Sequence, residues 1–458
     1  MTATRDVDEV RRSMSPMERW YWVCDQISPL NVVARVHVRG ACAPRDLDLA
    51  AEALVREHPL LRVAVDAEPD GSRPRFVGAA SHRPSLRVVE TEPSDVDRWV
   101  REVDDVELAL SLDWRTGPLV RLVDVVRGRG TADECHDVIL TVSHVIADGT
   151  TALELLRRLV ELAAGAARLV STRPALPPPE AMLPKRINGL PRAAHFVASV
   201  LADGVAAAVA RPRRLTPATP VESRGRRTRL IRRELTAAQV AELADRCRRA
   251  GVTVHSALTA AMAIALAGTT STRTRVTVGS PVDFRAELEP PVHPTDAGAY
   301  VATVPSHVQV APAADLWTVA RGAHRDLRRR KRFHQHLALV SLLRLMSPRS
   351  VAASARAVAM VDRVGPGNVC LSNIGRYDFP DRAGDWALSG AQFIADVSVS
   401  GYLVATVNTS HAALHWNFTY IEGAVSSERA EQFAERAVRA LLSGLHHTGA
   451  GVRTATRG

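Results

Sequence analysis

A proline- and arginine-rich segment in the middle of the chain constrains the fold most strongly, because it separates two regions of regular secondary structure. Residues 171–227 contain the runs RPALPPPEAMLPKR and RPRRLTPATPVESRGRRTR, and such clusters interrupt helices and strands. We therefore predict an N-terminal subdomain over residues 1–170, a crossover linker over 171–227 and a C-terminal subdomain over 228–458. The length of 458 residues agrees with two cores rather than one.

Both halves alternate strand-like and helix-like runs. NVVARVHVRG and DVILTVSH have the apolar pattern of strands, and PRDLDLAAEALVREHP has helical spacing. After the linker, RLIRREL is followed by two helical runs, in which Thr236 is a candidate N-cap and Gly251 a candidate stop. Further strand-like runs and a final helix over 426–445 complete the chain. We therefore expect an α/β (α+β) fold of two similar domains, each with a mixed sheet flanked by helices.

The charge of the chain favours an anionic partner. The formal net charge is +10, and lysine contributes only Lys185 and Lys331 to it. A surplus of this size attracts phosphorylated molecules or acidic proteins. Aromatic residues make up only 4% of the sequence, which argues against a surface that stacks nucleic-acid bases.

The cysteines and the apolar segments indicate a cytoplasmic protein without a metal site. Five single cysteines form no CxxC pair, so neither a zinc site nor a disulfide framework is indicated. The first 20 residues have no apolar core, unlike a signal peptide. The apolar run at 195–210 is too short for a transmembrane segment and contains Asp203.

The motif SHVIADG, residues 143–149, contains the strongest candidate for catalysis. His144 follows an apolar strand, and a neutral imidazole at that position can act as a general base. Asp148 can hold the following loop, and Gly149 allows a backbone geometry that a side chain would block. The spacing alone favours a simpler interpretation, in which a hydrogen-bonded histidine precedes an ordinary Asp-Gly turn.

The chain resembles a known superfamily at several places in order. SHVIADG is similar to the HHxxxDG motif of chloramphenicol acetyltransferase, condensation domains and plant and carnitine acyltransferases. The opening at 15–40 and the stretch 47–65 resemble bacterial condensation-like acyltransferases, especially the mycobacterial polyketide-associated enzymes that esterify diols. GSPVDFRAELEP, DAGAYVATVP and LSNIGR resemble motifs of the second half. The resemblance covers nearly all of residues 15–445.

The resemblance implies a role for each residue of the motif. His144 matches the catalytic base, and Asp148 matches a structural residue that we expect to pair with Arg285. Gly149 belongs to the same structural group. Ser143 replaces the first histidine, a position that supports the loop. Because of this replacement, one alternative is that the protein is a relative with the fold but without the activity. The retention of the other three motif residues argues against that alternative.

Other candidates remain open between two interpretations. Without the resemblance, Asp283 and Arg285 are interpreted as an ion pair on the surface. With it, Arg285 is the expected partner of Asp148, and Asp283 is a residue that shapes the site. Ser372 and Asn373 either stabilise an oxyanion or cap a turn. The basic run 321–336 is either a solvated helix face or a docking surface for coenzyme A or a carrier protein. His255, His334, His336, His411 and His415 lack matching carboxylates in the sequence and are assigned structural or surface roles.

The resemblance implies an acyltransferase with its site in a tunnel between the domains. An acyl group would move from a thioester, on coenzyme A or an acyl or peptidyl carrier protein, to the hydroxyl or amine of a lipid or secondary metabolite. We expect no tightly bound cofactor, no metal, no nucleic acid and no transmembrane segment. One alternative is a free-standing condensation domain that joins carrier-bound units, and another is a non-catalytic docking module of the same fold.

Overall fold

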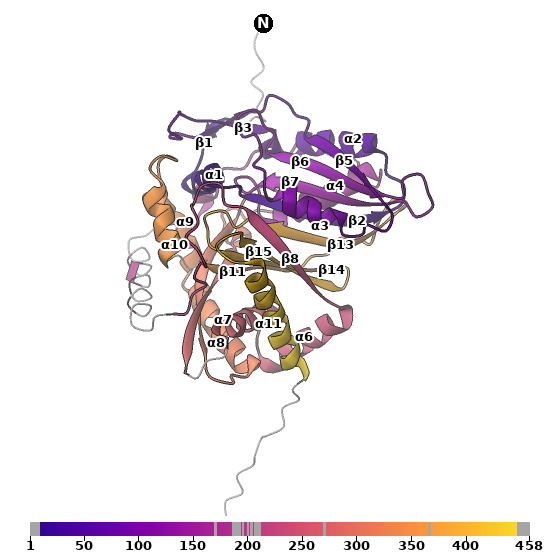
Figure 1. The fold of residues 1–458 in the computed structure, drawn as a ribbon. Coiled ribbons are helices and arrows are strands. Elements are labelled where there is room, and N and C mark those ends of the chain that lie inside the picture. The colour runs from indigo at the N-terminus through magenta and orange to yellow at the C-terminus, as the bar shows by residue number, and fades with distance from the viewer. Residues whose placement is uncertain are drawn as a thin grey trace, which may run out of the picture.

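The computed structural model describes residues 10–168, 172–185, 212–268, 272–364 and 368–446, together with isolated positions between 186 and 211. Two six-stranded sheets dominate these residues (Figure 1). One sheet lies with the N-terminal half of the chain and the other with the C-terminal half. Most of the apolar run at 195–210 and parts of the predicted linker lie outside the described residues.

The N-terminal sheet has the strand order β12-β13-β2-β7-β6-β5. Only the pair of β5 and β6 is parallel. The strands are β2 (Asn31–Arg39), β5 (Ser85–Thr91), β6 (Val120–Arg127), β7 (Cys135–Ser143), β12 (Arg382–Ala383) and β13 (Trp386–Ala395). Helix α4 (Gly149–Ala163) packs on β2, β7 and β13, and α2 (Pro44–Glu57) packs against α4.

The C-terminal sheet has the strand order β10-β9-β11-β14-β15-β8. Its strands are β8 (Thr228–Leu235), β9 (Thr274–Asp283), β10 (Val301–Val310), β11 (Val369–Arg376), β14 (Leu403–Ser410) and β15 (Ala413–Ile421). Its helices are α6 (Ala237–Ala250), α7 (Val254–Ala267), α8 (Leu316–Arg332) and α11 (Ser427–His446). The predicted caps are confirmed: Thr236 forms a capping box with Gln239, and Gly251 ends α6 in the left-handed conformation.

Smaller elements complete the described chain. The other strands are β1 (Arg12–Ser13), β3 (Val63–Asp66) and β4 (Arg75–Gly78), which form a three-stranded sheet. The other helices are α1 (Pro16–Ile27), α3 (Arg98–Glu102), α9 (Gln335–Met346) and α10 (Ala355–Val364), with short turns at Pro59–Arg62, Val103–Glu107, Pro179–Met182 and Arg285–Glu287. Within the described ranges, no single helix is both long and apolar enough to span a membrane, and α6 with α7 passes the same test only as a pair bent by 97°.

Strand β13 connects the two halves in a way that the sequence division did not anticipate. It belongs by sequence to the predicted C-terminal subdomain, yet it pairs with β2 in the N-terminal sheet, where Ala395 lies opposite Val32. The paired residues are 348 to 363 positions apart in the chain, and β13 is visible beside the N-terminal strands in Figure 1. The two sheets are therefore built from interleaved parts of the chain, and the exact boundaries remain predictions.

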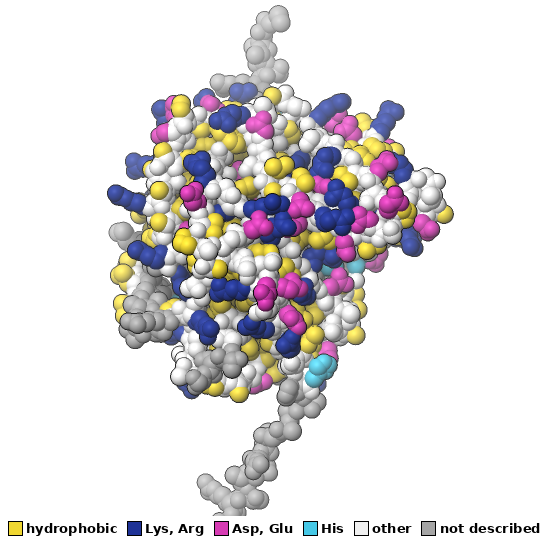
Figure 2. Space-filling view, viewed as in Figure 1, with side chains coloured by type: hydrophobic (Ala, Val, Ile, Leu, Met, Phe, Trp, Pro, Cys, Tyr) yellow, Lys and Arg dark blue, Asp and Glu magenta, His cyan; other side chains and the backbone are white. Residues whose placement is uncertain are grey.

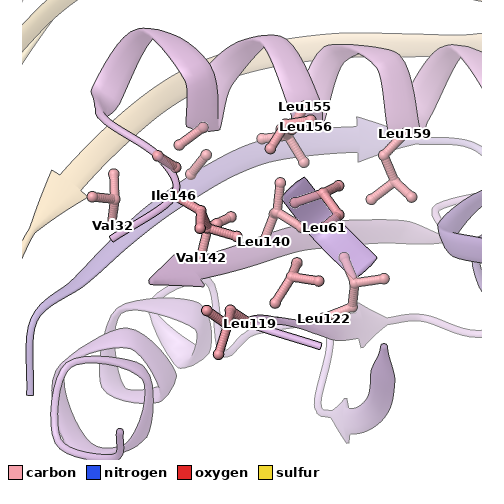
Figure 3. Packing of buried hydrophobic residues seen from close by; sticks show 14 of the residues in the cluster. Val32, Leu61, Leu119, Leu122, Leu140, Val142, Ile146, Leu155, Leu156 and Leu159 are labelled. Carbon is pink, nitrogen blue, oxygen red and sulfur yellow. The ribbon is translucent and has the colours of Figure 1, made fainter. Parts of the chain in front are cut away.

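The core of the N-terminal half fixes the end of β7, where the motif begins. Leu140 and Val142 on β7 pack with Ile146 of the following turn and with Leu156 of α4 (Figure 3). All four side chains are buried. Burial of apolar area stabilises such packing by about 25 cal/mol per Å². The turn that carries His144 is therefore held between a core strand and a core helix.

Candidate active site

A cavity of about 730 Å³ is lined by both halves of the chain. The N-terminal half contributes Tyr21, His144 and Asp148, among others. The C-terminal half contributes residues of α7, α8, β9, β11 and β13. This arrangement confirms the predicted fold, in which two domains enclose a site next to His144.

His144 stands at the carboxyl end of β7 with its ring at the cavity. Its main-chain N–H donates to the Leu30 carbonyl at 3.0 Å, which anchors the turn to the start of β2. The ring stacks on Tyr21 of α1, with 4.5 Å between centroids and 11° between planes. The Nδ1 atom is buried and makes no hydrogen bond of ordinary geometry to the described residues. The stacked tyrosine and the anchored backbone fix the orientation of the imidazole.

Burial lowers the pKa of His144 below its usual range. The charge of Asp148 and the main-chain groups of His144 and Ala147 oppose this effect but do not cancel it. Although the ring is deep among protein atoms, it keeps partial solvent accessibility because it lines the cavity. A histidine of this kind is neutral near pH 7 and can accept a proton there.

Asp148 is buried at the start of α4 and serves several donors at once. Its Oδ1 accepts from Thr151 N at 3.0 Å, as an N-cap does. Its Oδ2 accepts from Tyr300 N at 2.8 Å. Burial acts to raise the pKa of Asp148, but Arg285 and these hydrogen bonds together lower it. The ionised carboxylate therefore joins α4 to the segment that precedes β10.

The predicted partner of Asp148 is present. Arg285 Nη2 donates to Asp148 Oδ1 at 2.8 Å and to Thr151 Oγ1 at 2.7 Å, while Nη1 donates to Asp283 Oδ2 at 2.8 Å. The guanidinium lies 4.8 Å from the centre of the Tyr300 ring. Arg285 is only 3% exposed. Burial would lower its pKa, but Asp148 and Asp283 raise it, so this contact between the two halves is an ion pair.

Gly149 is required for a different reason from the one predicted. Its φ does not lie in the left-handed region. A Cβ at this position would stand 2.4 Å from Cε2 of Phe393 on β13. The glycine therefore allows α4 to approach β13 closely, and no special backbone conformation is involved.

Ser143 lies outside the cavity wall. Its side chain is buried, and its Oγ accepts a long hydrogen bond of 3.4 Å from Val145 N. Its main-chain carbonyl accepts from Ile146 N at 3.1 Å, which closes the turn. These contacts agree with a residue that supports the loop.

Ser372 and Asn373 both line the cavity from β11. They stand within the strand rather than at its end, although the register shifts between Asn373 and Gly375. Asn373 Oδ1 accepts from Gly375 N at 2.8 Å. This bond orients the amide so that its NH₂ group is the side left for other contacts. The oxygen of Asn373 therefore bonds within β11 at this irregularity and does not cap a turn, and an oxyanion role stays a prediction.

Part of the basic run 321–336 forms a wall of the cavity. His324, Leu327, Arg328, Lys331 and Arg332 of α8 line it, and the three cationic side chains are exposed. Arg329 is not among the lining residues, and its Nη2 donates to Asp326 at 2.9 Å. The run is thus a solvated helix face that also borders the cavity on one side. The face of the molecule in Figure 2 shows basic and acidic side chains interspersed.

Three sequence expectations about histidine are corrected. His255 lines the cavity, with its Nε2 3.1 Å from Ser280 Oγ, and burial lowers its pKa to about 4. His334 and His336 do have a matching carboxylate, because Glu287 lies 3.1 Å from His334 Nδ1 and 2.8 Å from His336 Nε2. His415 has one as well, with its Nδ1 3.4 Å from Glu234.

Glu287, His334 and His336 also form a grouping of possible metal ligands. One ligand atom from each lies within 4.8 Å of the others. The carboxylate comes from a turn 47 residues before the first histidine, so the spacing of the histidines gave no signal for it. None of the three residues lines the cavity.

The lining residues that were not predicted as site residues include Tyr21, Phe393 and Asp396. Tyr21 lies in a stretch that carries the resemblance, so its motif was a usable signal. Phe393 and Asp396 come from the end of β13 and from the residue that follows it. Their approach to His144 depends on the pairing of β13 with β2, which no local pattern reveals.

Comparison with protein families finds one model that matches less than half of the chain. Residues 224–382 match the model for the C-terminus of phthiocerol/phthiodiolone dimycocerosyl transferases. A search of curated proteins finds no significant match.

Solved structures match nearly the whole chain at low identity. Trichothecene 15-O-acetyltransferase from Fusarium sporotrichioides has a TM-score of 0.73 at 14% identity, covering 95% of each chain. Polyketide synthase associated protein 5 from Mycobacterium tuberculosis has 0.64 at 19%, covering 96% of this chain and 100% of that one. The epimerization domain from the third module of tyrocidine synthetase B has 0.66 at 14%, covering 97% and 99%. The chain therefore has the two-domain fold of condensation domains and chloramphenicol acetyltransferase-like acyltransferases.

Proposed function

We propose that this protein transfers an acyl group from a thioester to a hydroxyl or amine of a small molecule, with His144 as the general base. The observation that carries the proposal is the position of His144: a partly buried histidine with a lowered pKa at a cavity lined by both halves. The fold and the match to a dimycocerosyl transferase C-terminus support acyl transfer as the reaction class.

The chemistry needs one base and two well-placed reactants. The acceptor oxygen or nitrogen attacks the carbonyl carbon of the thioester while Nε2 of His144 takes its proton. The oxyanion intermediate then collapses, the carbon–sulfur bond breaks, and the imidazolium returns the proton to the thiolate. The products are an ester or amide and a free thiol. In the tautomer that carries its proton on Nδ1, the Nε2 lone pair is free for this task.

The walls of the cavity support separate tasks in this reaction. Ser372 and Asn373 lie on the wall formed by β11 and are the candidates for donating hydrogen bonds to the oxyanion. Arg328, Lys331 and Arg332 lie on the wall formed by α8 and are the candidates for binding phosphates of coenzyme A or of a phosphopantetheine arm. Asp148 and Arg285 hold the two halves in register around His144.

The test is mass spectrometry of products from a panel of donors and acceptors. Acyl-coenzyme A and acyl-loaded carrier proteins of graded chain length are incubated with the protein and mixed alcohols and amines. The proposal expects an acylated acceptor and one equivalent of free thiol. Transfer only between two carrier-bound units would assign a condensation reaction instead. No transfer from any donor, with a folded protein, would favour the docking module.

A further inference from the structure

Asp396 is a buried carboxyl group in the cavity whose hydrogen bonding is incomplete. It follows the last residue of β13 and is only 3% exposed. Its Oδ2 accepts from Asn31 N at 2.9 Å, and the Thr228 hydroxyl acts on the same carboxyl. Its Oδ1 is buried and has no hydrogen-bond partner among the described residues. A buried polar atom without a partner destabilises the empty site, so a ligand that supplies the partner gains affinity.

The sheet places Asp396 near the proposed base. Asp396 N donates to Asn31 O at 2.9 Å, and Asn31 is paired with Ser143 across β2 and β7. Neighbouring strands lie about 4.8 Å apart, so the main chains of Asp396 and Ser143 lie roughly 10 Å apart. The next residue after Ser143 is His144. One small molecule in the cavity can therefore reach both His144 and Asp396.

The surroundings of Asp396 disfavour its ionised form, and a cationic partner is the kind of group that would restore it. Burial raises the pKa of Asp396 well above its usual value, and the nearby buried carboxyl of Asp25 raises it further. Arg121 acts in the opposite direction, but its guanidinium is bound to Glu107 Oε2 at 2.6 Å and to the main-chain carbonyl of Leu110 at 2.9 Å. The cationic side chains that line the cavity come from α8, which lies against β10 of the other sheet. A positive group on the ligand would offset the cost of a charged carboxylate here.

We infer that Asp396 binds a protonated amine of the acceptor and so selects acceptors that carry a basic nitrogen remote from their reacting hydroxyl. This inference rests on the proposed acyl transfer and adds the class of acceptor. The cavity that Asp396 lines is also lined by the apolar side chains of Leu30, Val32, Phe393 and Val404. These residues suit an aliphatic chain between the hydroxyl and the nitrogen.

The experiment compares dimethylaminohexanol with a hydrocarbon isostere in which CH replaces the nitrogen. The tertiary amine cannot form a stable amide, so both compounds react only through the hydroxyl. Wild-type protein should show at least a tenfold higher kcat/KM for the amine, as expected for a hydrogen bond to a charged group. Asp396→Asn keeps an oxygen for Asn31 N but cannot ionise, and it should bring the ratio close to one.

The matched control is Asp25→Asn. Asp25 is also buried, and its Oδ1 accepts from Leu30 N at 3.0 Å, but it does not line the cavity. This variant should retain at least the wild-type preference for the amine, because the Asp25 carboxyl acts only to raise the pKa of Asp396. Thermal unfolding checks that both variants are folded. The wild-type comparison needs no variant: equal kcat/KM for the two alcohols would overturn the inference by itself.

A binding measurement separates this inference from the proposed function. Calorimetry measures dimethylaminohexanol and its isostere on the protein without any donor. Transfer without a preference for the amine would overturn the role of Asp396 and leave the transferase intact. A tenfold binding preference that Asp396→Asn abolishes, in a protein without transfer, would support the amine site and contradict the reaction. Equal binding of both compounds would overturn the amine site whatever the activity.

Discussion

Arg285 Nη2 lies 2.8 Å from Asp148 Oδ1, and this ion pair joins the two halves of the chain directly behind the turn that carries His144. Both side chains are buried. The same guanidinium nitrogen also donates to Thr151 Oγ1, and Asp148 caps the helix to which Thr151 belongs. The ion pair and the first turn of α4 are therefore joined in one hydrogen-bonded network.

The first prediction concerns the stability that this unit provides. Asp148→Ala and Arg285→Ala should each lower the free energy of unfolding by about 3–5 kcal/mol, because each removes the buried partner of a charged group. The double variant should lose less than the sum of the two. Urea denaturation of the single and double variants measures the coupling.

Asp283→Ala is the matched control for the ion pair. Asp283 also bonds to Arg285, but its side chain is 45% exposed, so its loss should cost only about 0–1 kcal/mol. Additive losses in the Asp148 and Arg285 double variant would show that the two residues act independently.

The second prediction is a loss of stability at low pH. The folded pKa of Asp148 is lowered, and the unfolded value is about 3.9. Its stabilising contribution is therefore complete above about pH 4 and is lost as the pH falls through the folded pKa. The gap in unfolding free energy between wild type and Asp148→Asn should be constant near neutral pH and shrink below about pH 4. A gap that widens on acidification would mean that the folded pKa is raised instead.

The residues of the motif could be predicted from the sequence because they lie close together along the chain. The family resemblance also allowed the prediction of Arg285, which lies far from them in the sequence. The other side of the cavity could not be predicted in the same way. In β13 the register shifts between Ser389 and Gln392, and Gly390 has a φ of 61°. A bulge breaks the alternation of a strand, so its sequence gives a weak signal. Phe393 and Asp396 were missed for this reason.

Contacts across long sequence distances account for the remaining differences. The pairing of β13 with β2 is determined by tertiary packing, and no local pattern in the sequence indicates it. Glu287 approaches His334 and His336 for the same reason. The sequence context indicated that position 149 needs a glycine. The physical reason, which is the nearby ring of Phe393, became clear only from the structure.

The third prediction tests the close approach at Gly149. Gly149→Ala places a methyl group 2.4 Å from the Phe393 ring, and we expect a loss of about 1–3 kcal/mol from overpacking. Phe393→Leu combined with Gly149→Ala should recover part of this loss, because it removes the atoms that clash. Thermal and urea unfolding measure both.

Gly322→Ala provides the control for this substitution. Gly322 lies in α8 with no neighbouring atom within 4 Å of an added Cβ. This change should stabilise the protein by about 0.5–1 kcal/mol, since glycine is unfavourable inside a helix. Equal destabilisation of Gly149→Ala with and without Phe393→Leu would mean that the phenyl ring is not the obstacle.

The fourth prediction concerns the basic wall of the cavity. Reversal of Arg328 and Lys331 to Glu should raise the KM of a phosphorylated donor roughly tenfold, the effect of losing about 1.4 kcal/mol of binding. Reversal of Arg321 and Arg325, which lie on α8 but do not line the cavity, should have little effect. Steady-state kinetics at two salt concentrations provides a second measure, because attraction between exposed charges is screened beyond about 10 Å at 0.1 M. If both double reversals raise the KM equally, the effect comes from the net charge of the protein and not from the residues that line the cavity.

The last prediction compares His144 with its neighbour Ser143. His144→Ala should keep the unfolding temperature near that of wild type and lower kcat by about 10²–10⁴, the usual effect of losing a general base. Because burial lowers the pKa of His144, wild-type kcat/KM should rise with pH and level off below the ordinary histidine value of about 6.5. Ser143→Ala should cause a modest loss, since its side chain lies outside the cavity wall and its Oγ accepts just a long hydrogen bond from Val145 N among the described residues. Unchanged turnover in His144→Ala would show that His144 is not the general base. A Ser143→Ala variant as inactive as His144→Ala would instead show that the serine has a chemical task which its buried position does not reveal.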